Sequence, residues 1–212
     1  MANTAELTNA EVLGLRRSPA GHLADDFAKG STAGTHGVSL RELPFQSMVG
    51  VRVDPGSDAG ARVAAVTGGL PASCGQVVAG PAGLATLWLG PQEFLVTAPA
   101  DRQSGLAPDL VAALADGAGQ VVELSANRTT FELSGPSARA VLEKGCAADL
   151  HPRAFTVGTA ITTEIGGIPV VLWKTGDDTF WILPRASFAD FLGRWLLDGM
   201  REFASVEGTP WP

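Results

Sequence analysis

SANRTTFELSGPSARAVLEKGCAADLHP, residues 125–152, predicts a strand directly before a helix. In TTFELS, residues 129–134, apolar and polar side chains alternate with a period of two, as in a half-buried strand. Pro136 suits a first helical position, and Gly145 can adopt the left-handed backbone that ends a helix. The apolar residues between them fall at helical spacing: Ala138, Val141 and Leu142.

The same order of elements occurs earlier in the chain, which indicates an internal repeat. The first copy reads as the strand MVGVRVD, the helix SDAGARVAAVTG, the hairpin TLWLGPQEFLVTAP and the helix LAPDLVAALADG. The second copy continues from the opening stretch with the hairpin PVVLWKTGDDTFWILP and the helix SFADFLGRWLLDGM. Two such strand-helix-hairpin-helix units predict an α+β fold in which helices cover one face of each antiparallel sheet.

The repeat also predicts the domain organisation. We expect an extended N-terminal arm over residues 1–46, a first α+β half over 47–125, a second half over 126–205 and a C-terminal tail over 206–212. Each hairpin is expected to turn at its glycine, in Gly90-Pro91 and in Gly176-Asp177.

The final helix carries the clearest helical pattern. Ser187 and Asp190 have the spacing of a capping box at its start. Its apolar side chains share one face: Phe188, Phe191, Leu192, Trp195 and Leu196.

Composition excludes several classes of partner. The formal net charge of −7 argues against a nucleic-acid or anionic-membrane surface, which would need an excess of basic residues. The apolar runs are too short to span a bilayer, and the N-terminus lacks the apolar core of a secretory signal, so we expect a cytoplasmic protein. In that compartment Cys74 and Cys146 are expected to stay reduced, and their spacing supports neither a disulfide framework nor a zinc site.

The sequence lacks the common self-sufficient catalytic motifs. It has no phosphate loop, no dinucleotide fingerprint, no HExxH and no GxSxG elbow, and its three histidines are widely separated. Cys146 with His151 could act as a thiolate and a base. However, Cys146 follows the C-terminal end of a predicted helix, where the helix dipole disfavours a thiolate, so we favour a packing role for it.

Several polar or aromatic residues outside the predicted core are candidate contacts with other protein chains. Asn127 and Arg128 precede the second-copy strand, where a guanidinium could hold a carboxylate or phosphate, although they could equally tie down a loop. Trp211 stands between two prolines near the chain end and could anchor on a partner or lie in a frayed tail. The remaining candidates are Arg41, His151 and Arg153.

The opening stretch and five further segments together resemble the gamma subunits of heterotetrameric sarcosine oxidases. The further segments are SPAGHL, VSLRELPF, VRVDPG, LWLGPQEFLV and PRASFADFLGRWLLDGMREF, so the resemblance covers residues 18–203. It implies a bacterial enzyme with alpha, beta, gamma and delta subunits that oxidises sarcosine to glycine. The enzyme of that family forms hydrogen peroxide and passes the one-carbon unit to tetrahydrofolate, giving 5,10-methylenetetrahydrofolate.

The resemblance further implies that FAD, FMN, NAD and zinc lie on the other subunits, and that this chain has no catalytic, cofactor-binding or metal-binding residue of its own. More distantly, the duplicated α+β pattern is similar to the folate-binding fold of aminomethyltransferases. VTAPADR, residues 96–102, departs from that pattern, and no counterpart of the catalytic acidic residue is evident. The similarity therefore predicts a scaffold that kept the fold and lost the site.

Two other functions remain as alternatives to a structural subunit. The first is a stand-alone, folate-binding one-carbon transferase, which the missing acidic residue disfavours. The second is a thiol-dependent oxidoreductase that uses Cys146, which the position of this cysteine after a helix disfavours.

Overall fold

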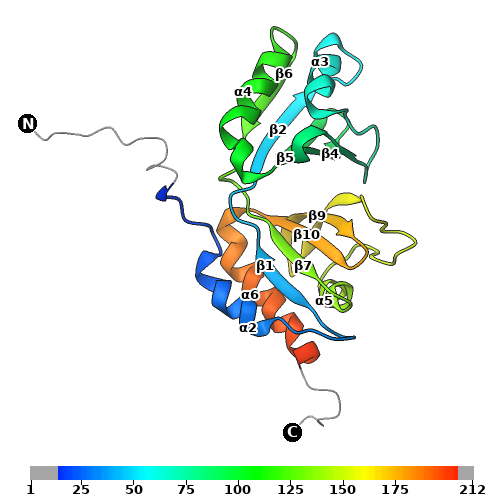
Figure 1. Ribbon diagram of the computed structural model, residues 1–212. Coiled ribbons are helices and arrows are strands. Elements are labelled where there is room, and N and C mark those ends of the chain that lie inside the picture. Colours follow the sequence, from blue (N-terminus) through cyan, green and yellow to red (C-terminus); the bar gives the residue numbers. More distant parts are fainter. Residues whose placement is uncertain (1–13, 205–212) are drawn as a thin grey trace, which may run out of the picture.

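A computed structural model describes residues 14–204 and shows two five-stranded antiparallel sheets, each with helices on one face (Figure 1). The α+β fold predicted from the repeat is confirmed. The strands are β1 (Ser39–Glu42), β2 (Ser47–Val53), β3 (Val77–Ala79), β4 (Ala85–Gly90), β5 (Glu93–Ala98), β6 (Gly119–Glu123), β7 (Phe131–Ser134), β8 (Ala160–Ile165), β9 (Ile168–Gly176) and β10 (Thr179–Pro184). The α-helices are α2 (Ala24–Gly30), α3 (Asp58–Thr67), α4 (Gln103–Leu114), α5 (Ala138–Glu143) and α6 (Ala189–Met200).

The first sheet has the strand order β3-β4-β5-β2-β6. Strand β2 alternates between a buried valine face and the exposed Arg52, as its period-two pattern predicts. The core under α3 and α4 contains apolar residues of strands and helices: Val49, Val51, Val53, Val63, Phe94, Val96, Leu106 and Leu110. Helix α3 begins where the Ser57 side chain accepts a hydrogen bond from the backbone N–H of Gly60 at 3.0 Å.

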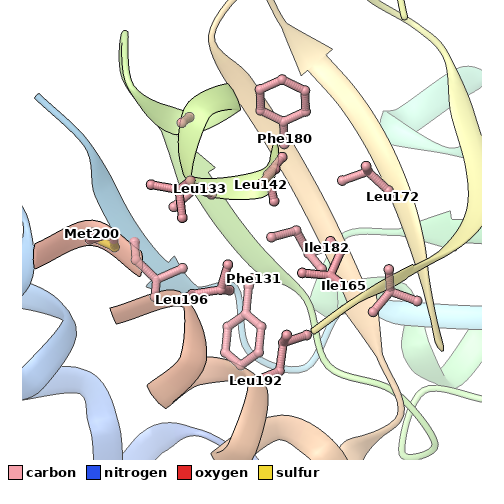
Figure 2. Close-up of a cluster of buried hydrophobic side chains, with 14 of the residues drawn as sticks. Phe131, Leu133, Leu142, Ile165, Leu172, Phe180, Ile182, Leu192, Leu196 and Met200 are labelled. Carbon is pink, nitrogen blue, oxygen red and sulfur yellow. The ribbon is translucent and has the colours of Figure 1, made fainter. Parts of the chain in front are cut away.

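The second sheet has the strand order β1-β7-β10-β9-β8 and packs against α2, α5 and α6. Figure 2 shows Phe131 of β7 beside Leu192 and Leu196 of α6. Phe131 and Leu133 are fully buried, because alternate residues of β7 point toward the helices.

A third apolar cluster joins the two sheets. Its members lie on strands of both sheets: Met48, Ala85, Leu87, Leu95, Ala160, Val171 and Leu183. Trp173 and Trp181 pack against this cluster with their rings at 77° and centroids 5.1 Å apart. The two halves therefore share apolar contacts in addition to the connecting chain.

The N-terminal segment differs from the extended arm that the sequence predicts over residues 1–46. Helix α2 and strand β1 form there, and β1 pairs with β7, matching Leu40 with Leu133. Leu23, Phe27 and Leu40 are buried in the second core, and the Phe27 and Phe131 rings meet edge to face at 5.8 Å. This segment belongs to the second half, because its apolar side chains are buried in one core with residues of β7 and α6.

Two predicted helix ends are wrong in detail. Gly145 does not have a positive φ, and a Cβ at that position would lie 2.6 Å from the Trp195 ring, so close packing requires the glycine. At the start of α6 no side chain caps the helix, so Ser187 and Asp190 do not form the predicted capping box. Asp190 instead accepts hydrogen bonds from His22 and Arg194.

Candidate functional site

A pocket rich in arginine lies where the chain passes between the two sheets. One connection, residues 43–46, runs from β1 to β2, and the other, residues 124–130, runs from β6 to β7. The pocket has a volume of about 180 Å³, and we call it the arginine pocket. Its lining residues are Arg16, Arg17, Pro19, Phe45, Ser125, Ala126, Arg128 and Thr129.

Arg128 is a half-buried cation of this pocket. Its Nη1 donates a hydrogen bond to the carbonyl of Leu183 at 2.9 Å, and its backbone forms an antiparallel bridge with Arg185. Burial lowers the pKa of Arg128 from its ordinary value, and the positive charge of Arg185 lowers it further. Because a guanidinium stays protonated in proteins, this lowered pKa means that the charge is held in an unfavourable environment.

Asn127 and Arg185 extend the polar surface beyond the pocket. The Asn127 side-chain oxygen accepts a hydrogen bond from Arg185 Nη1 at 3.5 Å, and its backbone carbonyl accepts one from Ala186 at 2.9 Å. The structure thus brings the predicted pair Asn127 and Arg128 next to Arg185, which sequence reasoning missed. The three residues meet because the connection before β7 lies alongside the end of β10.

The N-terminal side of the pocket contains Arg16, Arg17 and Phe45. The Arg16 guanidinium carbon lies 4.5 Å from the centroid of the Phe45 ring, which is a cation–π distance. Phe45 has a φ of 61°, a left-handed conformation that costs a residue with a side chain roughly 1–2 kcal/mol. Arg17 is exposed and donates to the backbone carbonyls of Gly14 and Arg16.

Glu42 fixes the N-terminal segment beside the connection to β7. Its carboxylate accepts hydrogen bonds from the Ser18 hydroxyl at 2.6 Å, the Thr129 hydroxyl at 2.5 Å and the backbone N–H of Ala20 at 3.2 Å. This network positions Arg16 and Arg17 through the adjoining backbone and is itself satisfied within the chain.

Arg41, another predicted contact residue, is paired within the chain. It binds Glu132 from the neighbouring strand at 2.7 Å, and the same carboxylate accepts a hydrogen bond from Trp181 Nε1 at 3.1 Å. The Arg41 side chain remains 64% exposed, so its outer edge is accessible while its charge already has a partner.

Cys146 and His151 have separate surroundings. The half-buried Cys146 packs against the second core, and its Sγ lies 3.9 Å from Thr163 Oγ1. His151 is exposed, and its Nδ1 accepts a hydrogen bond from the backbone of Arg153 at 3.2 Å. These contacts support a packing role for Cys146 and do not couple a thiol to an imidazole.

The remaining predictions concern metal sites, the membrane and the tail. Within residues 14–204, no group of three or more His, Cys, Asp or Glu side chains is arranged to hold a metal ion. No helix in the same range combines the length and apolar character needed to cross a membrane. Trp211 lies outside the described residues.

Comparison with solved structures first defines the class of fold. The chain is similar to the glycine cleavage system aminomethyltransferase T of Bartonella henselae, with 18% identity, a TM-score of 0.62, and coverage of 86% of this chain and 57% of that one. At this identity the likeness shows the fold alone, and it agrees with the predicted resemblance to the folate-binding fold.

Comparison with sequence families then identifies the particular protein family. The profile of the sarcosine oxidase gamma subunit family matches residues 50–202, and the chain belongs to this family. It is 55% identical to sarcosine oxidase subunit gamma of Corynebacterium sp. (strain P-1), over 95% of this chain and 98% of that protein. It is 54% identical to the subunit gamma of Arthrobacter sp, over the same shares of the two chains.

A solved structure supports the same assignment. A chain of heterotetrameric sarcosine oxidase from Corynebacterium sp. U-96, in complex with pyrrole 2-carboxylate, is 49% identical with a TM-score of 0.87. The match covers 92% of this chain and 100% of that chain.

Proposed function

We propose that this chain is a non-catalytic structural subunit that assembles with alpha, beta and delta subunits into sarcosine oxidase. The observation that carries the proposal is the match over the full length of a chain from a heterotetrameric sarcosine oxidase. Arg17 and Arg128 add support, because their printed hydrogen bonds go to neutral backbone carbonyls and their charges suit contact with another chain better than chemistry on a small substrate.

The assembled enzyme, on this proposal, is cytoplasmic and oxidises sarcosine to glycine with formation of hydrogen peroxide and 5,10-methylenetetrahydrofolate. FAD, FMN and NAD would bind the larger subunits, zinc the delta subunit, and tetrahydrofolate would be a co-substrate. The assignment of zinc to the delta subunit follows from the family resemblance. The residues of this chain would form contacts that hold the other subunits in place.

Co-expression of all four subunits tests this function. Native mass spectrometry of the complex should show one copy of this chain beside three other polypeptides, and the chain expressed alone should form no peroxide from sarcosine. The variant Cys146→Ala should assemble and oxidise sarcosine as the wild type does. An active chain without partners, or loss of turnover in the assembled variant, would contradict the proposal.

A folate-binding one-carbon transferase is the second candidate, and the aminomethyltransferase-like fold is the observation that favours it. Titration calorimetry of the chain with tetrahydrofolate distinguishes the two functions. Saturable binding would favour the transferase. Heat equal to that of dilution would contradict it.

A further inference from the structure

We propose that the arginine pocket docks an acidic segment of a neighbouring subunit, a stretch of chain that presents at least two carboxylate side chains. This inference rests on the proposed function as an assembled subunit and adds the place and the chemistry of one contact. It is carried by the charges, the exposed apolar groups and the backbone conformation around the pocket.

Three arginines at or beside the pocket carry positive charge without a salt bridge among the described residues. Among the described residues, Arg17, Arg128 and Arg185 form no salt bridge, whereas other arginines do. Their hydrogen bonds go to backbone carbonyls and to the Asn127 amide oxygen, all of them neutral acceptors. Three such cations gathered on a chain of net charge −7 create a local field that attracts anionic groups.

Arg128 and Arg185 are like charges on bridged backbone segments, and the charge of Arg185 lowers the pKa of Arg128. The strand bridge fixes their backbones side by side, and Arg128 is half-buried, so the Arg128 guanidinium cannot move fully into solvent. Carboxylates placed against both guanidinium groups would offset this repulsion and could bind in the bidentate geometry that arginine favours.

Apolar and aromatic side chains near the arginines favour a protein ligand over a free anion. Leu15, next to Arg16, is 63% exposed, and Phe188, whose backbone N–H donates to the carbonyl of Arg185, is 37% exposed. Phe45 contributes an aromatic ring to the pocket in a strained backbone conformation. Arginine together with aromatic and apolar side chains is the composition of protein interface centres, whereas a small anion would use only the charges.

The test uses the co-expressed four-subunit complex and the double variant Arg17→Glu/Arg185→Glu. Both side chains are exposed, so the variant should keep its fold, which hydrogen exchange in β7 and β10 can verify. We expect at least a tenfold weaker association of the chain with the other subunits at low salt, and a smaller dependence of association on salt. The matched control Arg52→Glu/Arg201→Glu changes the net charge equally at exposed sites elsewhere and should assemble normally.

A second variant identifies the partner directly. In Arg17→Lys/Arg185→Lys the new amines can be joined to adjacent carboxylates by a carbodiimide, and mass spectrometry should find a crosslink from position 17 or 185 to an acidic stretch of another subunit. Crosslinks from the native lysines alone would overturn the proposal.

The outcomes separate the docking site from the proposed function. A wild-type chain that fails to join the complex would contradict both. Normal assembly of the wild type and of the Glu double variant, with unchanged salt dependence, would overturn the docking site alone. Two results together would assign the pocket to a free anion and also overturn the docking site. The Glu double variant would assemble normally, and phosphate would raise the Tm of the wild-type complex but not that of the variant complex.

Discussion

The two sheets have the same strand order, but their edge strands come from different parts of the chain. The order β3-β4-β5-β2-β6 in the first sheet corresponds to β8-β9-β10-β7-β1 in the second, position by position. In the first sheet β6 follows α4 along the chain, whereas in the second the equivalent position is filled by β1, which precedes the whole first half. The first half is thus continuous, and the second half closes only with an N-terminal strand.

This difference explains where the arginine pocket lies. Because β1 belongs to the second sheet, the chain must cross from one half to the other twice, at residues 43–46 and 124–130. Phe45 comes from the first crossing and Arg128 from the second. A repeat with two continuous halves would need only one crossing at this place.

Removing the N-terminal segment should have the largest effect on the stability of the second half relative to the first. Deletion of residues 1–46 removes β1 and α2 and uncovers the buried faces of Phe131 and Leu133, so the second half should lose its cooperative fold. Hydrogen exchange should show full exchange in β7 and β10 and retained protection in β2 and β5. Equal protection of both halves would mean that the segment is only an arm.

A single substitution in the core of the second half should also lower its stability. Phe27→Ala removes a buried ring that contacts Phe131, and we expect it to lower the free energy of unfolding by about 3–5 kcal/mol. Urea denaturation followed by tryptophan fluorescence measures this loss. The exposed Val111→Ala serves as the control and should change stability by about 0.5 kcal/mol or less.

Gly145→Ala tests whether close packing sets the end of α5. The added methyl group would meet Trp195 and the backbone of Gly166, so we expect a loss of about 1–3 kcal/mol. Gly56 in the first half has no positive φ, and a Cβ there would lie 3.5 Å from Asp54 Oδ1, an ordinary contact. Gly56→Ala should therefore leave the free energy of unfolding nearly unchanged. Thermal unfolding of the two variants compares them, and equal Tm values would contradict the packing argument.

Cys146→Ala should have a small effect on stability, about 1 kcal/mol, because it removes a half-buried sulfur packed on the second core. Sarcosine-dependent peroxide formation by the assembled complex should stay at the wild-type rate. An inactive complex with an intact fold would instead revive the thiol-dependent mechanism.

The smallest predicted effect is an acid dependence of the contact between the N-terminal segment and α6. Hydrogen bonds from His22 and then Arg194 lower the pKa of Asp190 below its ordinary value of 3.8. A lowered folded-state pKa stabilises the protein above pH 3.8, and this contribution is lost as the pH falls through the folded value. Asp190→Asn should slightly flatten the fall in Tm below pH 4, whereas the exposed Asp177→Asn should leave it unchanged.

Sequence periodicity predicted the elements whose signals are local. The alternation in TTFELS and the helical face of Leu192 and Leu196 could be read directly, because each pattern repeats within a few residues. Strand β1 has only four residues and pairs with β7, about ninety positions further along the chain. A sequence pattern within a few residues therefore does not indicate this pairing. Strand β6 was also missed, because its residues are mostly exposed and its partner β2 lies far from it along the chain.

Local patterns in the sequence therefore predicted the duplicated hairpins and helices and their α+β class, and the resemblance predicted the family. Of the arginine pocket the sequence indicated Asn127 and Arg128, two neighbours in the chain. Only the tertiary structure placed Arg17 and Arg185 with them and made β1 the edge of the second sheet. The physical reason is that local patterns fix which face of an element is buried, whereas long-range pairing and the field of gathered charges exist only once distant segments meet.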